Sequence, residues 1–572
     1  MNSGTKNPAS GIFIFFLMVW GCLNLLQARL TPLNNDEAYY WMYSRFPDWG
    51  FFDHPPMIAL MIKAGYSLFQ NELGVRLLSV ISNILTLLII WNLTDKEFRN
   101  KTVNVVFIVI VTAALPAFTV YGFIATPDSP LLLFSAVFLL AYREFTKEDK
   151  LSNALFLGFS MAALMYSKYH GALLILLVIL SNLQLFKSRS FYIALLFAVI
   201  LFIPHLYWQY SNGIPSLKYH LVERVNSFEA DHVPDYFLNM LLMHNPLILP
   251  VGLWVIFRTR SVNKFDKALR YTIAGFFLFF FAATFRYHIQ AQWTSLVSIP
   301  LSILLFKSIS PRSAAGRYLK WVSLFTIPVF LFARSAFMFD FLPVSYLKTE
   351  FHNNKIWAEE IEKIAAGRPA VFTNSYQNAS VYSFYTGKFA HSLNNLAYRK
   401  NQYDLWDFEE QLHGKEILYL PHFMTDQLRM NLSANVLPWG DTLFWMVIKD
   451  FQSLQRECVI LESDRYSFVR SDTNTLPVEI YNPYPFPLNL KHKVLPVVFQ
   501  LAFIRDGYME IKKNIELPEE FAVLNPGDTI RTRYRFTLED LPPGKYKIAV
   551  CSETGLLYDT YNSKFREAIV TE

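Results

Sequence analysis

Long apolar runs follow one another from residue 11 to about residue 340, and they constrain the fold of this chain more than any other feature. As a helix, an apolar run of about 20 residues crosses the roughly 30 Å hydrocarbon core of a bilayer. Of the 572 residues, 53% are hydrophobic and only 17% charged, which is unusual for a soluble protein. We therefore predict a polytopic α-helical membrane protein with a water-exposed C-terminal part.

The apolar runs predict eleven membrane spans, the shorter of which extend into their flanks or sit where the bilayer thins. The first run follows a start that carries Lys6, as in a signal peptide, but no small-x-small cleavage site comes before Asp36, so we expect a retained helix. Pro55–Phe69 is also apolar, yet it begins with Pro-Pro and carries Lys63, which favours a helix along the interface. The predicted spans are Gly11–Ala28, Gly74–Leu93, Val103–Tyr121, Pro130–Tyr142, Leu151–Ser167, Gly171–Phe186, Phe191–Trp208, Pro246–Phe257, Ala268–Phe285, Ile289–Phe306 and Tyr318–Ala336.

The loops between these spans alternate in charge, which gives the orientation. Every second loop holds at least two basic residues, while the loops between them are poor in Lys and Arg, as the positive-inside rule requires. The net charge of +6 therefore marks cytoplasmic loops and not a nucleic-acid partner. An odd number of spans places the C-terminal part outside the cytoplasm. The basic loops are Asp95–Lys101, Arg143–Lys150, Lys187–Ser190, Arg258–Lys267 and Lys307–Lys320.

The C-terminal part predicts two further domains beyond the transmembrane domain of residues 11–340. Residues 345–470 combine the helical spacing of Asn353–Gly367 with strand signals at Pro369–Thr373, Ile417–Leu420 and Cys458–Leu461, which indicates an α/β domain. From 471 to 572 short strands alternate with turns, as in an immunoglobulin-like β-sandwich. A disulfide between Cys458 and Cys551 stays open, because spacing does not establish pairing.

An acidic and aromatic stretch directly after the first apolar run is the strongest candidate for a functional site. It reads Asn35-Asp36-Glu37-Ala38-Tyr39-Tyr40-Trp41 and is followed by Gly50-Phe51-Phe52-Asp53-His54-Pro55-Pro56. Carboxylates so close to hydrocarbon are costly and indicate function. The alternative is a solvated interfacial loop whose Tyr and Trp form a membrane belt.

Further polar groups lie in loops predicted to share this side of the membrane. Carboxylates there could carry out acid–base chemistry, and cations could hold an anionic headgroup, so an amphipathic substrate with a phosphate would suit the site. The catalytic candidates are Asp36 and Glu37, and the candidates for substrate binding are Asp53, His54, Asp128, Lys168, His220, Arg224 and His288.

Several of these motifs together resemble the C-type membrane glycosyltransferases, in particular the protein-mannosyltransferase-like and aminoarabinose-transferase-like families. The resemblance rests on Asp36–Trp41, on Asp53–Pro56 and on Thr126-Pro127-Asp128-Ser129-Pro130-Leu131. It is supported by Gly74–Ser79, by Pro215–Leu221, and by His288-Ile289-Gln290-Ala291-Gln292-Trp293. It covers roughly residues 11–340 and implies the C-type glycosyltransferase fold there.

The resemblance implies transfer of a sugar from a polyprenyl-phosphate carrier to an acceptor hydroxyl or phosphate outside the cytoplasmic membrane. It implies in-line, inverting attack with Asp36 as the base, since the acceptor hydroxyl must lose its proton as it attacks. Glu37 would point elsewhere on a helix and takes a supporting role. Relatives can carry lysine where this chain has His54, so Lys168 and Arg224 are the better cations for the phosphate leaving group.

Other interpretations remain open at this point. Asp128 either orients the acceptor or binds a metal, or it caps the helix that begins near Pro130. A transporter or flippase of a lipid-linked glycan is the alternative function, and it would show charged or broken helices near the midplane and an internal repeat. A membrane-anchored adhesion protein would explain only the C-terminal part.

The identity of the substrates is not fixed by these motifs. Pentose, aminopentose and hexose donors such as mannose are open, as are lipid A, surface glycan and protein acceptors. We expect no cofactor; a divalent metal is possible but not indicated. The expected location is the cytoplasmic membrane, with the C-terminal domains periplasmic in a Gram-negative cell.

Overall fold

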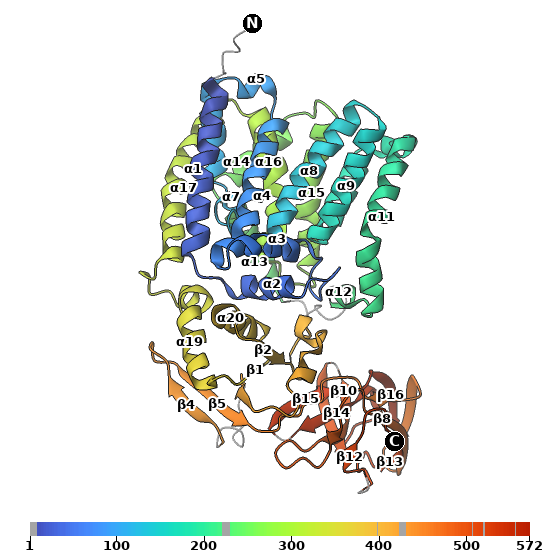
Figure 1. The fold of residues 1–572 in the computed structure, drawn as a ribbon. Helices are drawn as coiled ribbons and strands as arrows, with labels where there is room; N and C mark the ends of the chain where they lie inside the picture. Colours follow the sequence, from blue (N-terminus) through green and yellow to red (C-terminus); the bar gives the residue numbers. More distant parts are fainter. Residues whose placement is uncertain are drawn as a thin grey trace. The chain divides into compact units, whose positions relative to one another are not determined.

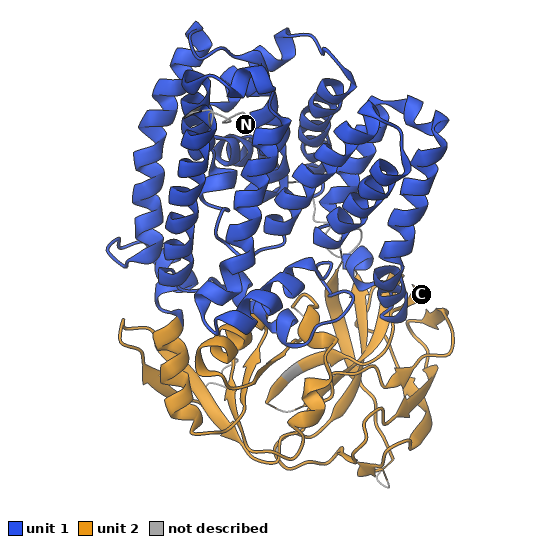
Figure 2. Ribbon diagram, turned by 45° about the horizontal axis from the view of Figure 1, so that its top comes forward, with its two compact units in different colours: residues 1–354 blue, residues 355–572 orange. Residues whose placement is uncertain are grey.

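The protein is described by a computed structural model that covers residues 8–219, 229–396, 398–422, 431–505, 507–518, 521–554 and 556–572. It divides into two compact units, residues 1–354 and 355–572 (Figure 2). The first unit is helical and the second is rich in strands, as the sequence predicts.

The helical unit is a bundle of long helices with short helices across one end (Figure 1). Its interior is a continuous cluster of buried Leu, Ile, Val and Phe side chains contributed by most of the long helices. Its helices are α1 (Pro8–Leu30), α2 (Asn35–Arg45), α3 (Met57–Leu68), α4 (Glu72–Leu93), α5 (Lys96–Arg99), α6 (Thr102–Ala113), α7 (Pro116–Thr119), α8 (Asp128–Lys147), α9 (Leu151–Ser167), α10 (His170–Ser181), α11 (Arg189–Ser211), α12 (Pro215–Lys218), α13 (His232–His244), α14 (Leu249–Arg258), α15 (Lys264–Ala283), α16 (Ser298–Ser308), α17 (Ala314–Met338) and α18 (Ser345–Leu347), with 3-10 segments η1 (Leu183–Lys187) and η3 (Ala291–Val297) and a π-helical segment η4 (Lys348–His352).

Each of the eleven predicted spans contains a helix, but not all are continuous. Within the described residues, five helices are long and apolar enough to cross a membrane by themselves: α1, α4, α8, α11 and α17. A sixth span results if α13 and α14, bent by 87° at their junction, are taken together. The span predicted over Val103–Tyr121 breaks at Leu115, because Pro116 begins α7. The number of spans therefore stays a prediction.

Two helices lie in stretches that the sequence assigned to loops. The acidic and aromatic stretch forms α2, and α13 lies within the predicted loop Gln209–Asn245. Pro55–Phe69 does form a helix, α3, which begins after Pro56. In Figure 1, α2 and α3 lie across the ends of the long helices of this unit, so the candidate motif borders one end of the bundle, here called the α2 end.

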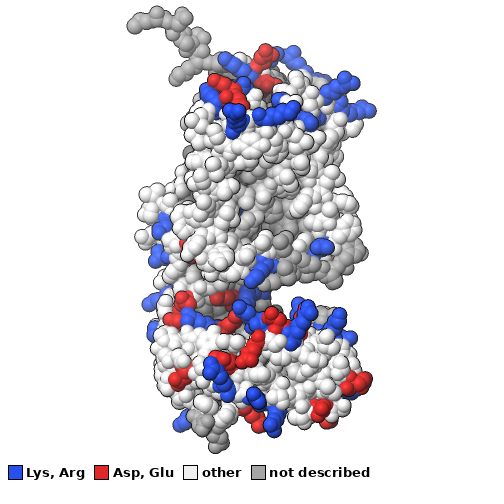
Figure 3. Space-filling model, turned by 90° about the vertical axis from the view of Figure 1, so that its right-hand side faces the viewer, with Lys and Arg blue, Asp and Glu red and all other residues white. Residues whose placement is uncertain are grey.

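Charged side chains gather at the ends of the helical unit. Figure 3 shows Lys and Arg concentrated at the end that carries α5, with a broad band of largely uncharged side chains beside it. Chain segments at this end include Lys96 to Lys101 and Arg143 to Lys150, two of the predicted basic loops. A multi-pass membrane protein needs such an uncharged band to face hydrocarbon.

The second unit begins with a five-stranded mixed sheet in the order β2-β1-β3-β5-β4. Its parallel part joins β1 to β2 through α20, a crossover of the α/β type, as expected for this region. The elements are α19 (Asn354–Ala365), β1 (Ala370–Thr373), α20 (Tyr376–Thr386), β2 (Ala390–Leu393), β3 (Ile417–Leu420), β4 (Ser433–Val436) and β5 (Thr442–Ile448).

The rest of this unit holds antiparallel sheets around one hydrophobic cluster. One sheet has the path β11-β10-β14-β16-β7 with β15 beside β14, and a smaller one has the order β13-β8-β6. Both contribute buried residues to the same cluster, for example Val478 and Leu501. The immunoglobulin-like sandwich itself stays a prediction. The strands are β6 (Val459–Ile460), β7 (Arg465–Val469), β8 (Asn474–Tyr481), β9 (Leu488–Asn489), β10 (Val498–Arg505), β11 (Tyr508–Asn514), β12 (Val523–Leu524), β13 (Thr529–Phe536), β14 (Gly544–Thr554), β15 (Leu557–Tyr561) and β16 (Arg566–Thr571).

Two details of the second unit differ from the expectations. The strand predicted at Cys458–Leu461 was assigned to the α/β domain, but β6 pairs with β8, so it belongs to the antiparallel part. β7 also precedes residue 471 and pairs with β16. Cys458 and Cys551 are both buried free thiols, so the disulfide left open above is not formed.

Candidate active site

The start of α2 is fixed by a capping box. The Asn34 side chain accepts a hydrogen bond from the Glu37 amide at 2.7 Å, and the Glu37 carboxylate accepts one from the Asn34 amide at 3.2 Å. This pattern satisfies two backbone donors that a helix end leaves without partners. It places Asp36 in the first turn, where a carboxylate is favoured by the helix dipole.

Glu37 is fully buried and forms an ion pair with Arg76 of α4. Arg76 Nε donates to Glu37 Oε1 at 2.7 Å, and the Ala125 amide donates to the same oxygen at 2.8 Å. The Arg76 guanidinium also donates to backbone carbonyls at the end of α1, including that of Ala28 at 3.1 Å. The pair therefore ties α1, α2, α4 and the segment before α8 together. Glu37 supports the fold of the site and does not reach its surface.

Asp36 is exposed, and the segment that follows α17 lies beside it. Asn354 Nδ2 donates to Leu33 O and Asn35 Oδ1, each at 3.1 Å, and to Glu350 O at 2.9 Å. Burial and then the negative charge of Asp36 raise the pKa of Glu350, while hydrogen bonds with Asn35 oppose that rise. Two carboxylates from distant parts of the chain thus share the start of α2.

Asp53 is hydrogen-bonded to two tyrosines of α2. Its Oδ2 accepts hydrogen bonds from Tyr39 Oη at 2.9 Å and Tyr43 Oη at 3.1 Å, which lie one helical turn apart. The Asp53 side chain is buried, at 6% exposure, so these hydroxyls replace water around it. The neighbouring His54 packs edge-on against Tyr40, with ring centroids 5.7 Å apart. The Asp36–Trp41 and Asp53–Pro56 motifs are therefore joined into one structural element.

The loop between α2 and α3 is also held by α11. Trp208 Nε1 donates to Asp48 Oδ2 at 2.7 Å, and His205 Nδ1 lies 2.7 Å from the Trp49 carbonyl oxygen. Because a carbonyl only accepts, His205 carries its proton on Nδ1, and Nε2 accepts from Tyr169 Oη at 3.0 Å. His205 therefore holds the loop between α2 and α3 against α11.

Asp128 and Lys168 form a second buried ion pair. Lys168 Nζ lies 2.9 Å from both carboxylate oxygens, and both side chains are less than 10% exposed. The helix-capping alternative for Asp128 is wrong, since Pro127 precedes α8 without a side-chain cap and Asp128 is already the first helical residue. Lys168 has three N–H donors, of which this pair engages two, so its positive charge is largely compensated.

The remaining candidates for substrate binding are His288, His220 and Arg224. His288 is exposed and lies 3.2 Å from Asp235 of α13, with its ring 5.9 Å from that of His232. His220 and Arg224 lie outside the described residues. His244 is fully buried between Ser298 and Thr294, a structural position.

Chemically, the α2 end offers an exposed carboxylate on a rigid helix, a second carboxylate beside it, and the compensated Asp128–Lys168 pair. Within the residues that the structure describes, no group of three or more His, Cys, Asp or Glu side chains could hold a metal. An exposed carboxylate on a fixed backbone can accept a proton from a bound hydroxyl.

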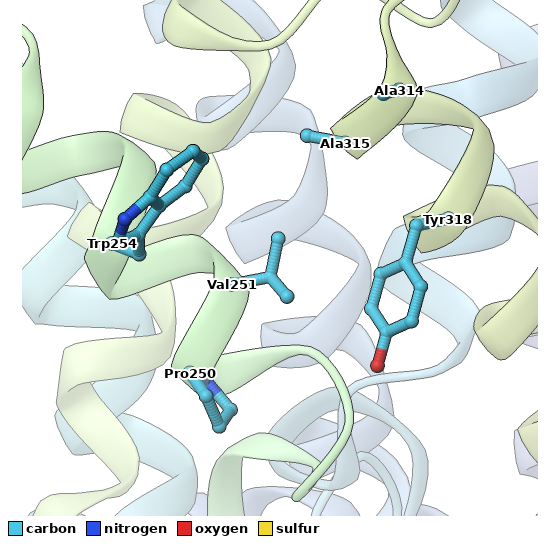
Figure 4. A pocket seen from close by; sticks show the side chains of 6 residues that line it. All are labelled: Pro250, Val251, Trp254, Ala314, Ala315 and Tyr318. Carbon is cyan, nitrogen blue, oxygen red and sulfur yellow. The ribbon is translucent and has the colours of Figure 1, made fainter.

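One pocket in the helical unit lies away from this chemistry. It is an open apolar groove of about 430 Å³ between α14 and α17, lined by Pro250, Val251, Trp254, Ala314, Ala315 and Tyr318 (Figure 4). None of the candidate site residues that the structure describes lines it. We therefore place the site by its side-chain chemistry and not by this groove.

The motifs did not identify the ion pair of Arg76 or the position of Glu350. An arginine in the first turns of a long apolar helix is costly unless it is paired, and that cost is the signal in the sequence that could have identified Arg76. No signal marked Glu350, because its neighbour Asp36 is over 300 residues away in the sequence.

Comparison with known proteins agrees with the motifs. Residues 53–208 match the model of the dolichyl-phosphate-mannose-protein mannosyltransferase family. Lipid A galacturonosyltransferase RgtD from Rhizobium johnstonii is 24% identical over 274 residues, which cover 46% of this chain and 57% of that protein. The matched region thus spans less than two-thirds of that relative.

Solved structures share the fold. The apo crystal structure of ArnT from Cupriavidus metallidurans superimposes with a TM-score of 0.58 at 13% identity, over 77% of this chain and 98% of that one. The structure of the same protein bound to undecaprenyl phosphate gives a TM-score of 0.57 at 13% identity, over 76% and 98% of the two chains. In its motifs, in the family match over residues 53–208 and in its fold, this chain is similar to the protein-mannosyltransferase-like and aminoarabinose-transferase-like C-type membrane glycosyltransferases.

Proposed function

We propose that this protein transfers a sugar from a polyprenyl-phosphate carrier to an acceptor in the cell envelope, with Asp36 as the general base. The reaction takes place at the α2 end, on the outer face of the cytoplasmic membrane. The acceptor oxygen forms a bond to the anomeric carbon while its proton passes to Asp36, and the bond from that carbon to the phosphate oxygen breaks. The configuration inverts, and polyprenyl phosphate leaves.

The observation that carries this proposal is the contrast between the two acidic residues of α2. Glu37 is fully buried and bonded to Arg76 and to the Ala125 amide, whereas Asp36 is exposed one position earlier. The bonds of Glu37 fix the backbone that carries Asp36. A general base needs both a fixed position and access to its substrate.

The leaving phosphate needs donors that stabilise its negative charge. Lys168 has one N–H beyond those directed at Asp128, and His54 lies beside Tyr40 in the loop that follows α2. His220, Arg224 and His288 are the further candidates. These binding roles are part of the proposal.

The relatives suggest the class of donor and acceptor. One acts on lipid A as a galacturonosyltransferase, and another has been captured with undecaprenyl phosphate. We infer an undecaprenyl-type carrier and a lipid A or related envelope acceptor for this chain. The two soluble domains would then bind the acceptor or a partner glycan.

The test is transfer by the purified protein in detergent from a panel of polyprenyl-phosphate sugars to lipid A, with and without a chelator. We expect one donor to be used, and we expect Asp36→Asn to lower transfer by at least about 10²-fold, the usual contribution of a general base. Asp95→Asn removes an exposed carboxylate at the opposite end of the bundle and is the matched control, expected to transfer normally.

The outcomes separate the parts of the proposal. Transfer retained by a folded Asp36→Asn protein would remove Asp36 from its role. Loss of transfer with the chelator would add a metal to the reaction. Movement of the intact lipid-linked sugar across the bilayer without transfer would instead favour the flippase.

One feature matches the expectation for that alternative, namely the 87° break between α13 and α14. The polar groups at the break, however, are bonded within the protein. Asn245 Nδ2 donates to Ala114 O at 2.9 Å and to Thr326 Oγ1 at 3.2 Å, and His244 contacts Ser298 and Thr294. A closed break of this kind does not line a path, so transfer remains the better function.

A further inference from the structure

The apolar groove between α14 and α17 has no part in the proposed reaction. Its volume of about 430 Å³ lies in the range of roughly 300–1,000 Å³ that is typical of ligand sites. Figure 4 shows the Trp254 and Tyr318 rings on its two sides, with Val251 and Ala315 between them. Both rings are exposed. On a membrane-spanning bundle such a hollow suits a hydrocarbon chain, because apolar walls of this kind are poorly hydrated.

The groove arises because α14 is short and α17 begins with small side chains. α14 follows the 87° break and has 10 residues, so at 1.5 Å per residue it is about 15 Å long, half of the hydrocarbon core. Ala314 and Ala315 leave space in the first turn of α17. A chain in the groove would therefore belong to a lipid of one leaflet.

The groove lies at the end of the helical unit that carries α5. Thr259 directly follows α14, and its Oγ1 lies 3.5 Å from Ser308 Oγ at the end of α16. The neighbouring Lys307 Nζ lies 3.6 Å from Asp95 Oδ1, directly before α5. α17 begins after a short turn from α16. This is the end at which Figure 3 shows Lys and Arg concentrated, and the positive-inside pattern assigns it to the cytoplasm.

Two exposed arginines flank the groove at this end. Arg258, the last residue of α14, lies one turn beyond Trp254, and its guanidinium carbon is 4.9 Å from the centre of that ring. Arg312 comes two residues before Ala314, and its carbonyl accepts a hydrogen bond from Arg317 Nη1 at 2.6 Å. Within the described residues, neither Arg258 nor Arg312 forms an ion pair with a carboxylate. Their N–H donors can therefore bind a phosphate.

We propose that the groove binds one anionic phospholipid of the surrounding bilayer, with an acyl chain between Trp254 and Tyr318 and the headgroup phosphate at Arg258 and Arg312. Basic pockets between transmembrane helices on the cytoplasmic side bind anionic headgroups. An arginine that only snorkels to the interface, or that only balances the dipole of α14, would not need a hollow beside it. The polyprenyl carrier fits less well, because its chain is much longer than one leaflet is deep.

The test measures quenching of tryptophan fluorescence by phospholipids brominated on one acyl chain, in mixed micelles that contain either phosphatidylglycerol or phosphatidylcholine. The difference between wild type and Trp254→Phe isolates the quenching of Trp254. We expect half-maximal quenching at an at least about five-fold lower mole fraction of phosphatidylglycerol, the factor that corresponds to about 1 kcal/mol for one basic residue beside an anionic lipid.

Variants separate the headgroup from the chain. Arg258→Gln should remove most of the preference for phosphatidylglycerol, and Arg258→Lys, which keeps the charge, should retain most of it. Ala314→Phe fills the hollow and should abolish the preference. Arg189→Gln is the matched control, because Arg189 is an exposed arginine at the start of α11 that does not line the groove, and it should leave the preference unchanged.

Equal quenching by the two lipids in wild type would show ordinary contact with the bilayer and overturn the proposal. A preference that folded Arg258→Gln and Ala314→Phe proteins both retain would overturn it as well. Displacement of brominated phosphatidylglycerol by an equimolar amount of undecaprenyl phosphate would make the carrier the occupant and not a phospholipid. No sugar transfer is measured, so each of these results is independent of the role of Asp36.

Discussion

At the scale of single residues, two neighbouring carboxylates on α2 have opposite surroundings. Asp36 is exposed, while Glu37 is fully buried and accepts hydrogen bonds from Arg76, Asn34 and Ala125. Burying an ion pair costs desolvation, so its presence adds little to stability by itself. Removing one partner, however, leaves the other charge buried and uncompensated. The Glu37–Arg76 pair is therefore a point where one substitution decides whether the site forms.

We predict that Arg76→Met lowers the free energy of unfolding by about 3–5 kcal/mol. Unfolding in mixed micelles with increasing SDS measures this change. Adding Glu37→Gln should recover part of the loss, because the Gln oxygen can still accept from the Ala125 amide and no buried charge is left without a partner. Arg29→Met, which breaks the largely exposed contact with Glu72, should cost less than about 1 kcal/mol. An Arg76→Met protein as stable as wild type would show that the pair is not needed.

At the scale of helices, α17 is fastened to α1 by a buried arginine. Arg334 Nε donates to Gln27 Oε1 at 3.0 Å and Nη2 to Asn24 Oδ1 at 2.8 Å, and the guanidinium lies over the rings of Trp20 and Phe123. Arg76 lies 5.6 Å from the same Phe123 ring. The contact between α1 and α17 thus adjoins the ion pair that positions Glu37.

We expect Arg334→Met to lower the free energy of unfolding by roughly 2–4 kcal/mol. The substitution leaves two buried amide oxygens without donors, and each unsatisfied group costs about 1–3 kcal/mol, offset in part by the lost desolvation of the charge. The same SDS titration gives the value. Arg317→Met, on the exposed side of the same helix, is the matched control and should change stability by less than about 0.5 kcal/mol. Equal effects of the two substitutions would show that Arg334 does not hold α17 against α1.

The sequence allowed the helices to be predicted better than their interruptions. Apolar composition is enough to locate α1, α4 and α11, because a membrane span must bury its backbone polar groups in a helix. The break near Leu115 comes from Pro116, which a reading by apolar composition passes over. The break at Asn245 has tertiary partners such as Thr326, which no local pattern reveals. α13 was missed because His232 and Asp235 gave its start the composition of a loop.

The same limit applies to the site. Motifs identified Asp36, Asp53 and Asp128 as candidates, but the partners of the last two come from other elements. A motif states which residue types are present and not which of them neutralise one another. Lys168, predicted as a cation for phosphate, is paired with Asp128. Which polar groups compensate each other is a property of the packed structure.

At the scale of the whole molecule, a buried carboxylate connects the two halves of the strand-rich unit, which are the mixed sheet and the antiparallel sheets. Glu409, at 7% exposure, accepts hydrogen bonds from Ser453 Oγ at 2.6 Å and the Gln455 amide at 2.9 Å, and from Tyr484 Oη at 2.7 Å. Tyr484 belongs to the cluster inside the antiparallel sheets. Glu409 itself lies in the segment between β2 and β3, so it links the two halves of this unit.

Burial raises the pKa of Glu409 above its usual value, against the opposing effect of hydrogen bonds from Ser453 and Tyr484. A raised pKa in the folded state means that the folded protein binds the proton more tightly than the unfolded chain does. The stability from this group is therefore complete below the unfolded pKa of about 4.3 and is lost as pH rises through the folded pKa.

We predict that the stability of wild type relative to Glu409→Gln is greatest at acid pH and declines towards neutral pH. Hydrogen exchange of the β10 and β14 amides, compared between the two proteins at each pH, measures this difference, with Glu359→Gln on the exposed side of α19 as the control for losing one carboxylate. A relative stability that instead grew with pH would mean that hydrogen bonds to the ionised Glu409, and not its burial, govern how the two halves are joined.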